Sequence, residues 1–142
     1  MFSGIGAYHQ QAEMHKMLAL CTACQFVKGR MHMESWLENI LMRMVMIYRK
    51  IYGDAVTGVY LYGSYARGDF EKDSDVDIVA VVKGERSVLQ DKMRTIWDLS
   101  AEIGLEYDIV VSPTVIPYDE FEAYKEVLPY YRNIVNEGKR IG

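Results

Sequence analysis

The order of apolar and polar residues along the chain predicts a helix followed by two strands. Residues 34–52 place apolar side chains three and four positions apart, which is typical of an amphipathic helix, and Gly53 follows as a C-terminal stop. Residues 59–62 and 78–82 are short runs of β-branched, aliphatic and aromatic side chains bounded by turn residues, and both predict strands.

The same pattern continues in the second half of the chain. A helix is predicted over 86–103, with Gly104 beyond its end, and a third strand over 105–111, closed by Ser112 and Pro113. Two more helices are predicted over 119–127 and 129–137. Because two strands follow one another without a helical crossover, we expect a small mixed sheet with helices packed on it, an α/β fold. The expected inward positions of the helix 86–103 are Leu89, Met93, Ile96, Trp97 and Ile103.

The first thirty residues predict a separate helical extension. Residues 8–28 contain neither glycine nor proline and carry an apolar stripe, which favours a helix that ends near Gly29. Cys21 and Cys24 lie inside this helical pattern, whereas zinc ligands usually come from turns, so we interpret them as a buried face. Residues 1–30 are therefore expected to be an accessory segment or an upstream mis-start.

Composition and charge exclude several classes of function. The chain has 142 residues, a formal net charge of −4 and a pI of about 5.4, and no basic stripe that would predict an extended nucleic-acid surface. No apolar stretch is long enough to cross a bilayer, and the N-terminus lacks a secretion signal. Two cysteines do not make a disulfide framework, so we expect a cytoplasmic protein.

The polar loop between the first two strands carries the candidate chemistry. Gly63 and Ser64 end the first strand, and backbone N–H groups and a hydroxyl at such a turn can hold phosphate oxygens. Arg67 adds a planar, positively charged guanidinium group that can bind the same phosphates. Asp75 and Asp77 open the second strand on one face, with Cα atoms roughly 6 to 7 Å apart. Two carboxylates so placed repel one another unless a hard cation such as magnesium lies between them.

Asp108 is the third candidate acid. It falls inside the predicted strand 105–111, where an unpaired aspartate is costly. If this strand lies beside the second one, Asp108 can face Asp75 and Asp77, and three acids suit a site for two metal ions. Each feature alone is more often a turn or a cap, but their combination in one short chain favours a catalytic site.

The segments GSYARG and SDVDIVAVV closely resemble the minimal nucleotidyltransferases of the polymerase-β-like superfamily, above all the antitoxins of HEPN–MNT toxin–antitoxin pairs. The resemblance covers about residues 34–111 and implies a nucleotidyltransferase domain over 31–142. It also implies Mg²⁺-dependent transfer of AMP from ATP to a tyrosine hydroxyl of a HEPN toxin partner. The residues that it implies are Asp75, Asp77 and Asp108 for two Mg²⁺ ions, and Gly63, Ser64 and Arg67 for the nucleotide triphosphate.

Two other functions remain open at this point. One is adenylylation of a small molecule such as an aminoglycoside, although such enzymes carry a substantial further domain. The other is an antitoxin that neutralises its partner by binding alone. The sequence also leaves open whether Asp108 is a base or only a metal ligand, and whether the chain forms homo-oligomers.

Overall fold

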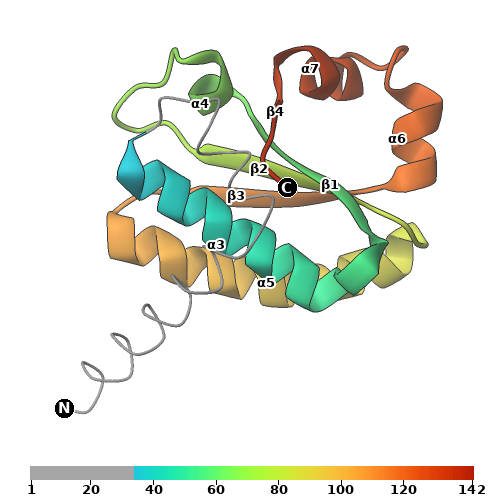
Figure 1. Ribbon diagram of the computed structural model, residues 1–142, viewed down its shortest axis with the longest axis horizontal. Helices are drawn as coiled ribbons and strands as arrows, with labels where there is room; N and C mark the ends of the chain where they lie inside the picture. Colours follow the sequence, from blue (N-terminus) through green and yellow to red (C-terminus); the bar gives the residue numbers. More distant parts are fainter. Residues whose placement is uncertain (1–33) are drawn as a thin grey trace.

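The computed structural model describes residues 34–142, and the structural statements below concern that part of the chain (Figure 1). The predicted helix over 8–28 and the cysteine pair Cys21 and Cys24 lie outside the described residues.

The centre of the fold is a four-stranded mixed sheet with the strand order β3–β2–β1–β4. Strands β1 (Val56–Tyr62) and β2 (Val76–Val82) pair antiparallel, and β3 (Val111–Pro117) runs parallel to β2. The short β4 (Lys139–Arg140) pairs antiparallel with β1. The predicted mixed α/β sheet is therefore confirmed.

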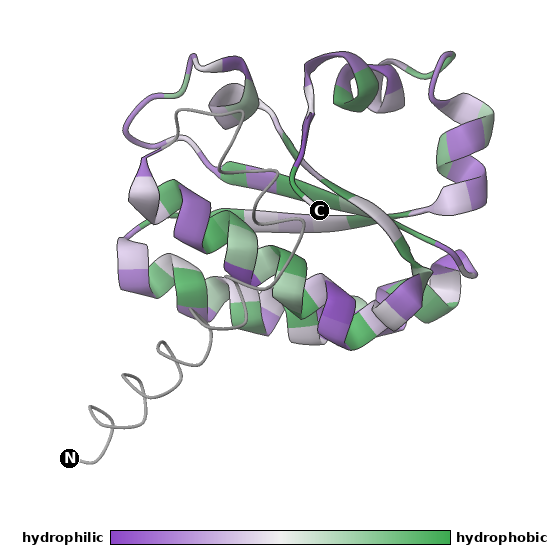
Figure 2. Cartoon of the chain, in the orientation of Figure 1, coloured by the Kyte–Doolittle hydropathy of each residue, from purple (hydrophilic) through white to green (hydrophobic). Residues whose placement is uncertain are grey.

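Two long helices cover one face of the sheet. Helix α3 (Ser35–Tyr52) and helix α5 (Arg86–Tyr107) lie next to each other below the strands in Figure 1. Figure 2 shows apolar and polar residues interspersed along both helices, and the apolar ones that are buried belong to the larger core between the helices and the sheet. Burial of these side chains is the main driving force for this half of the fold. The fully buried members include Ile40, Leu41, Met44, Ile78, Ala80 and Ile96.

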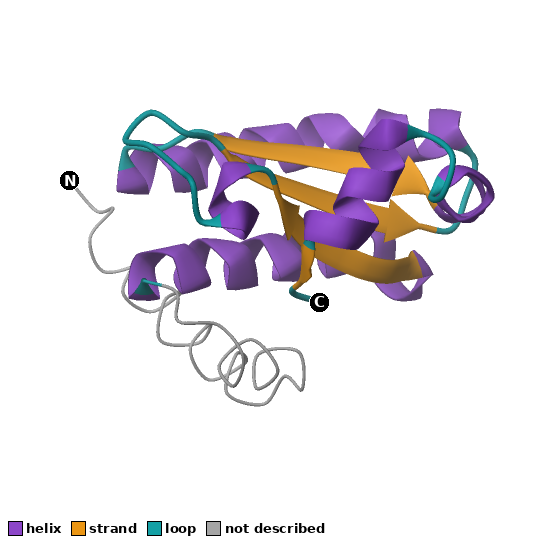
Figure 3. Cartoon of the chain, turned by 90° about the horizontal axis from the view of Figure 1, so that it is seen from above, coloured by secondary structure: helices purple, strands orange, loops and turns teal. Residues whose placement is uncertain are grey.

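The opposite face of the sheet carries a smaller core under two short helices. Helix α6 (Tyr118–Tyr124) follows β3 directly, and helix α7 (Pro129–Glu137) leads into β4. Figure 3 shows both on the side of the strands opposite α3. Because side chains alternate along a strand, Val79 and Val81 face this core while their neighbours face the larger one. The other buried members are Ile116, Phe121, Tyr131 and Ile134.

Three short elements were not predicted from the sequence. A single helical turn, α4 (Ser64–Arg67), follows β1, and a 3₁₀ turn, η1 (Gly53–Ala55), links α3 to β1. Strand β4 has two residues. None of the three is long enough to produce a hydrophobic period.

The predicted third strand is wrong in its position. Residues 105–107 continue helix α5, and the strand begins only at Val111, the last of the residues over which we expected it. Gly104 does not end the helix, which continues to Tyr107. It is buried within α5, and a Cβ atom on it would collide with the carbonyl oxygen of Ile109. Pro113 lies inside β3 rather than after it, which an edge strand tolerates because the missing N–H need not break the ladder.

One predicted core position is also wrong. Trp97 was expected to face inward from α5, but its side chain is 48% exposed. The other four predicted inward residues of that helix are buried, as expected. Ile96 already fills the inward direction at this turn, and its neighbour one position along the helix is rotated by about 100° away from it.

Candidate active site

The turn between β1 and α4 has Gly63 at its centre, and the carboxylate of Asp77 lies against this glycine. This residue has a φ of 75°, a conformation that favours glycine. A Cβ atom on Gly63 would lie 2.5 Å from Oδ2 of Asp77, so the carboxylate occupies the place where a side chain would be. The carbonyl oxygen of Gly63 accepts hydrogen bonds from the N–H groups of Ala66 and Arg67, which forms the single turn of α4. Ser64 follows Gly63 as the first residue of that turn.

Strand β2 presents the two predicted aspartates at its beginning. Asp75 immediately precedes the strand and is exposed, and Asp77 is half-buried on the face of the smaller core. Burial, and next the charge of Asp75, raise the pKa of Asp77, whereas the charge of Arg67 opposes them. Asp75 and Arg67 are thus both close enough to Asp77 to affect its ionisation.

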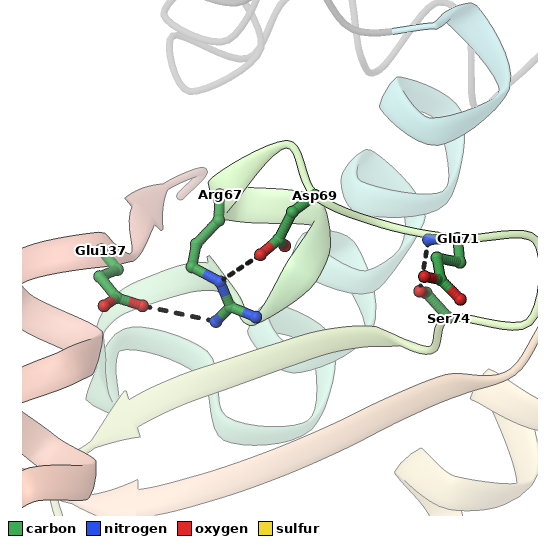
Figure 4. Close-up of polar contacts among 5 residues, drawn as sticks. All are labelled: Arg67, Asp69, Glu71, Ser74 and Glu137. Carbon is green, nitrogen blue, oxygen red and sulfur yellow. Dashed lines mark hydrogen bonds and ion pairs between the residues drawn. The ribbon is translucent and has the colours of Figure 1, made fainter.

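Arg67 is held by ion pairs on two sides (Figure 4). Its Nε lies 3.2 Å from Oδ2 of Asp69, and one terminal nitrogen lies 3.4 Å from Oε2 of Glu137 at the end of α7. The side chain of Arg67 is 45% exposed, so the guanidinium can exchange these partners for a ligand's oxygens. The pair with Asp69, and secondarily that with Glu137, raises the pKa of Arg67.

The loop between α4 and β2 is tied by local contacts. Ser74 Oγ accepts a hydrogen bond of 2.8 Å from the N–H of Glu71, and the N–H of Ser74 donates to the carbonyl oxygen of Glu71 (Figure 4). Phe70 stacks on Tyr65 of α4 with ring centroids 4.4 Å apart. These contacts fix the path of the chain from Arg67 to Asp75.

Asp108 is not brought to this site in the way that the sequence predicted. It is the residue after α5, exposed, with a left-handed backbone (φ 54°), rather than a residue inside a strand. It lines two neighbouring grooves of 610 and 440 Å³ together with Lys72, and neither groove includes Asp75 or Asp77. The register position beside Asp77 on β3 belongs to Ser112.

The predicted three-acid metal site is therefore not assembled. Among residues 34–142 there is no group of three or more histidine, cysteine, aspartate or glutamate side chains arranged to hold a metal ion. What remains of the prediction is the pair Asp75 and Asp77 beside Gly63, Ser64 and Arg67.

Two tyrosines and a glutamate lie at this site although the sequence pattern did not indicate them. Tyr62 pairs across the strands with Asp77, and its hydroxyl lies 3.3 Å from that of Tyr130 on α7. Tyr62 precedes Gly63 directly, so its position could have been inferred from the strand. Tyr130 and Glu137 are far away in the sequence and carry no local signal of their approach.

The family assignment follows from comparison with known proteins. A model of the nucleotidyltransferase domain matches residues 41–141, which is most of the chain and includes every residue of the site. The chain belongs to the nucleotidyltransferase domain family.

Its relatives include proteins of Methanocaldococcus jannaschii that are named as protein adenylyltransferases. MJ0141 is 42% identical over 62 residues, which is 44% of this chain and 61% of that protein. MJ0604 is 26% identical over 72% of this chain and 94% of its own length. The spectinomycin 9-adenylyltransferase of Staphylococcus aureus is 29% identical over 58% of this chain and 35% of the enzyme. The chain thus matches about three fifths of MJ0141 and a smaller part of the spectinomycin enzyme.

Solved structures with a similar fold include a mutant of the toxin–antitoxin MntA–HpeT. That structure is 15% identical over 72% of each chain, with a TM-score of 0.46. A toxin–antitoxin structure with AMP-PNP is 16% identical, with a TM-score of 0.43. Identities this low do not transfer a function. None of the helices described in residues 34–142 is long and apolar enough to span a membrane.

Proposed function

We propose that this chain is a magnesium-dependent nucleotidyltransferase that moves AMP from ATP to a hydroxyl group of a protein. The observation that carries the proposal is the placement of Asp77 over Gly63, with Asp75 and Arg67 beside it. A nucleotide triphosphate needs close approach to backbone, a cation between its oxygens and the protein carboxylates, and a positive side chain. Gly63, the two aspartates and Arg67 would supply these three features at one end of the sheet.

The donor set fits magnesium. Burial, and next the charge of Asp75, raise the pKa of Asp77, so the metal-free pair is repulsive. Magnesium is commonly bound by one or two carboxylates together with phosphate oxygens and water, so a third protein acid is not required. The proposed metal ligands are Asp75 and Asp77 alone.

The other residues would bind and orient the substrate. Gly63 leaves room for phosphate oxygens beside Asp77, and Ser64 offers a hydroxyl at the same turn. Arg67 would turn from Asp69 and Glu137 toward the triphosphate. When bound, magnesium would offset negative charge on the α-phosphate and on the departing pyrophosphate.

The proposed acceptor is a tyrosine of a HEPN toxin, with the reaction taking place in the cytoplasm and the chain acting as antitoxin. The support for a protein acceptor is the naming of the archaeal relatives as protein adenylyltransferases. The support for a HEPN partner is the resemblance of the segments around Gly63 and Asp77 to HEPN-linked antitoxins.

The test uses the full chain, magnesium, ATP labelled at the α-phosphate, and the HEPN-type product of a neighbouring gene. We expect label on a tyrosine of the partner, lost when Asp75→Ala and Asp77→Ala are combined. Asp73→Ala, in the exposed loop before β2, is the matched control and keeps the transfer. A stable complex that forms without any transfer of label would instead make the chain a binding antitoxin.

A small-molecule acceptor is the second candidate, because the chain resembles the spectinomycin 9-adenylyltransferase of Staphylococcus aureus. The same labelled ATP is incubated with the chain and spectinomycin. Label on the drug at a rate above that on the partner protein would favour this candidate over the first.

A further inference from the structure

We propose that Tyr130 is an acceptor in the chain's own active site, so that without a partner the protein transfers AMP onto this tyrosine in cis. The inference rests on the proposed function, because it needs the site to bind ATP and to activate its α-phosphate. It adds an acceptor within the chain.

The first support is the position of helix α7, which contacts the candidate site at both of its ends. Glu137, its last residue, pairs with Arg67, and Tyr130, its second residue, reaches Tyr62. Nine helical residues span about 13 Å, so the two contacts lie at opposite ends of the helix. Figure 1 shows α7 beside α4, on the side of the sheet away from α3 and α5.

The second support is the hydroxyl of Tyr130 itself. It lies 3.3 Å from the hydroxyl of Tyr62, and the two rings meet edge to face with centroids 6.0 Å apart. Tyr62 is the cross-strand partner of Asp77, and such partners have Cβ atoms about 5 Å apart on one face of a sheet. The Tyr130 hydroxyl thus contacts the residue that pairs across the strands with Asp77, the proposed metal ligand.

The third support is the contrast between Tyr130 and Tyr131. Consecutive helical residues point about 100° apart, so only one of the two can face the core. Tyr131 is 8% exposed, packs against Phe121 and donates its hydroxyl hydrogen bond to Glu120. Tyr130 is 44% exposed, and its hydroxyl has a tyrosine rather than a carboxylate as partner. The chain thus holds one accessible tyrosine next to the site and a buried neighbour that serves as its control.

The reaction balances without any further reagent than ATP. The Tyr130 oxygen forms a bond to the α-phosphorus, and the bond from that phosphorus to the oxygen that bridges to the β-phosphorus breaks. Pyrophosphate leaves with the electron pair of the broken bond. The hydroxyl proton passes to solvent water; because burial and the hydrogen bond with Tyr62 raise the pKa of Tyr130, this proton leaves as the new bond forms and not before it. An acceptor in the same molecule as the bound ATP would have a high effective concentration, which favours transfer within one molecule.

The experiment incubates the purified full chain with magnesium and ATP labelled at the α-phosphate, and locates the label by peptide mass spectrometry. We expect one AMP per chain on the peptide that contains Tyr130. The label is lost in Tyr130→Phe and retained in Tyr131→Phe, with thermal unfolding of both variants measured to show that they fold. Label on any other tyrosine, including Tyr8 or Tyr62, overturns the proposal.

A mixing experiment tests whether the transfer is intramolecular. A tagged Asp75→Ala and Asp77→Ala double variant is incubated with untagged wild-type chain and labelled ATP. We expect label on the wild-type chain alone, and label on the tagged chain contradicts transfer in cis.

Binding of ATP is measured in parallel to separate the two proposals. Magnesium-dependent ATP binding without self-labelling refutes the role of Tyr130 and leaves the proposed function intact. Absence of ATP binding refutes both.

Discussion

Asp77 is the residue whose surroundings bear most directly on the proposed chemistry. The sequence predicted its proximity to Asp75, because residues two apart in a strand share a face. It could not predict that the carboxylate lies over Gly63, since that contact depends on how β1 and β2 pair. Burial, and next the charge of Asp75, raise the pKa of Asp77. The ionised carboxylate of Asp77 is therefore disfavoured until a cation binds.

Replacing Asp77→Asn should therefore stabilise the metal-free protein at neutral pH. A carboxyl with a raised pKa in the folded state binds its proton more tightly there than in the unfolded chain, so its ionisation costs stability above that pKa. This cost in stability disappears as the pH falls below the ordinary pKa of aspartate. The extra stability of the Asp77→Asn variant therefore shrinks over the same pH range. Denaturant unfolding at neutral and acid pH measures the difference, and magnesium should stabilise the wild type but not the variant.

Asp73→Asn is the control for this measurement, because Asp73 lies in the exposed loop before β2. It should leave the free energy of unfolding unchanged. A loss of stability in Asp77→Asn at neutral pH would contradict the assignment of a repulsive, half-buried carboxylate pair.

At the scale of elements, the sequence predicted the long periodic segments well and the segment after α5 badly. Helix α3 and strands β1 and β2 carry clear patterns, and the structure confirms them with small changes at their ends. In 105–111 the apolar run suggested a strand, but helix α5 continues to Tyr107 and ends where the N–H groups of Asp108 and Ile109 donate to the carbonyl oxygen of Gly104. Asp108 is consequently a helix-terminal residue, and the strand that should have carried it starts at Val111.

The position of Asp108 leads to a direct test of its role. Asparagine adopts the left-handed conformation as readily as aspartate, so Asp108→Asn should keep both the fold and magnesium-dependent ATP binding within about twofold. Asp108→Val, with a β-branched side chain at the same φ, should cost about 1 to 2 kcal/mol of stability. Thermal unfolding and ATP titration measure these effects. If Asp108→Asn folds normally but loses ATP binding, Asp108 belongs to the metal site after all.

At the scale of the whole molecule, the site depends on contacts that no local pattern reveals. Arg67 meets Glu137 across 70 residues of sequence, and Tyr62 meets Tyr130 across 68. Both contacts arise because β4 pairs with β1 and draws the end of α7 to the end of that strand. The sequence could therefore predict the loop that we propose to bind phosphate but not the helix that lies against it.

The division of the fold into two faces explains where a substrate can enter. Helices α3 and α5 close one face with the larger core, while the shorter α6 and α7 cover the other with the smaller core. Asp75, Arg67 and Tyr130 are exposed at the end of the sheet on this second side. A nucleotide bound at the proposed site would therefore reach the aspartate pair without opening the larger core.

The measurement that tests the central claim most directly is an equilibrium titration of the full chain with ATP, with and without magnesium. The account predicts saturable binding that requires magnesium and is lost when Asp75→Asn and Asp77→Asn are combined in a chain that still folds. Binding that is absent in the wild type, or that survives the double substitution unchanged, would contradict a nucleotide site built on this aspartate pair and the Gly63–Ser64 turn.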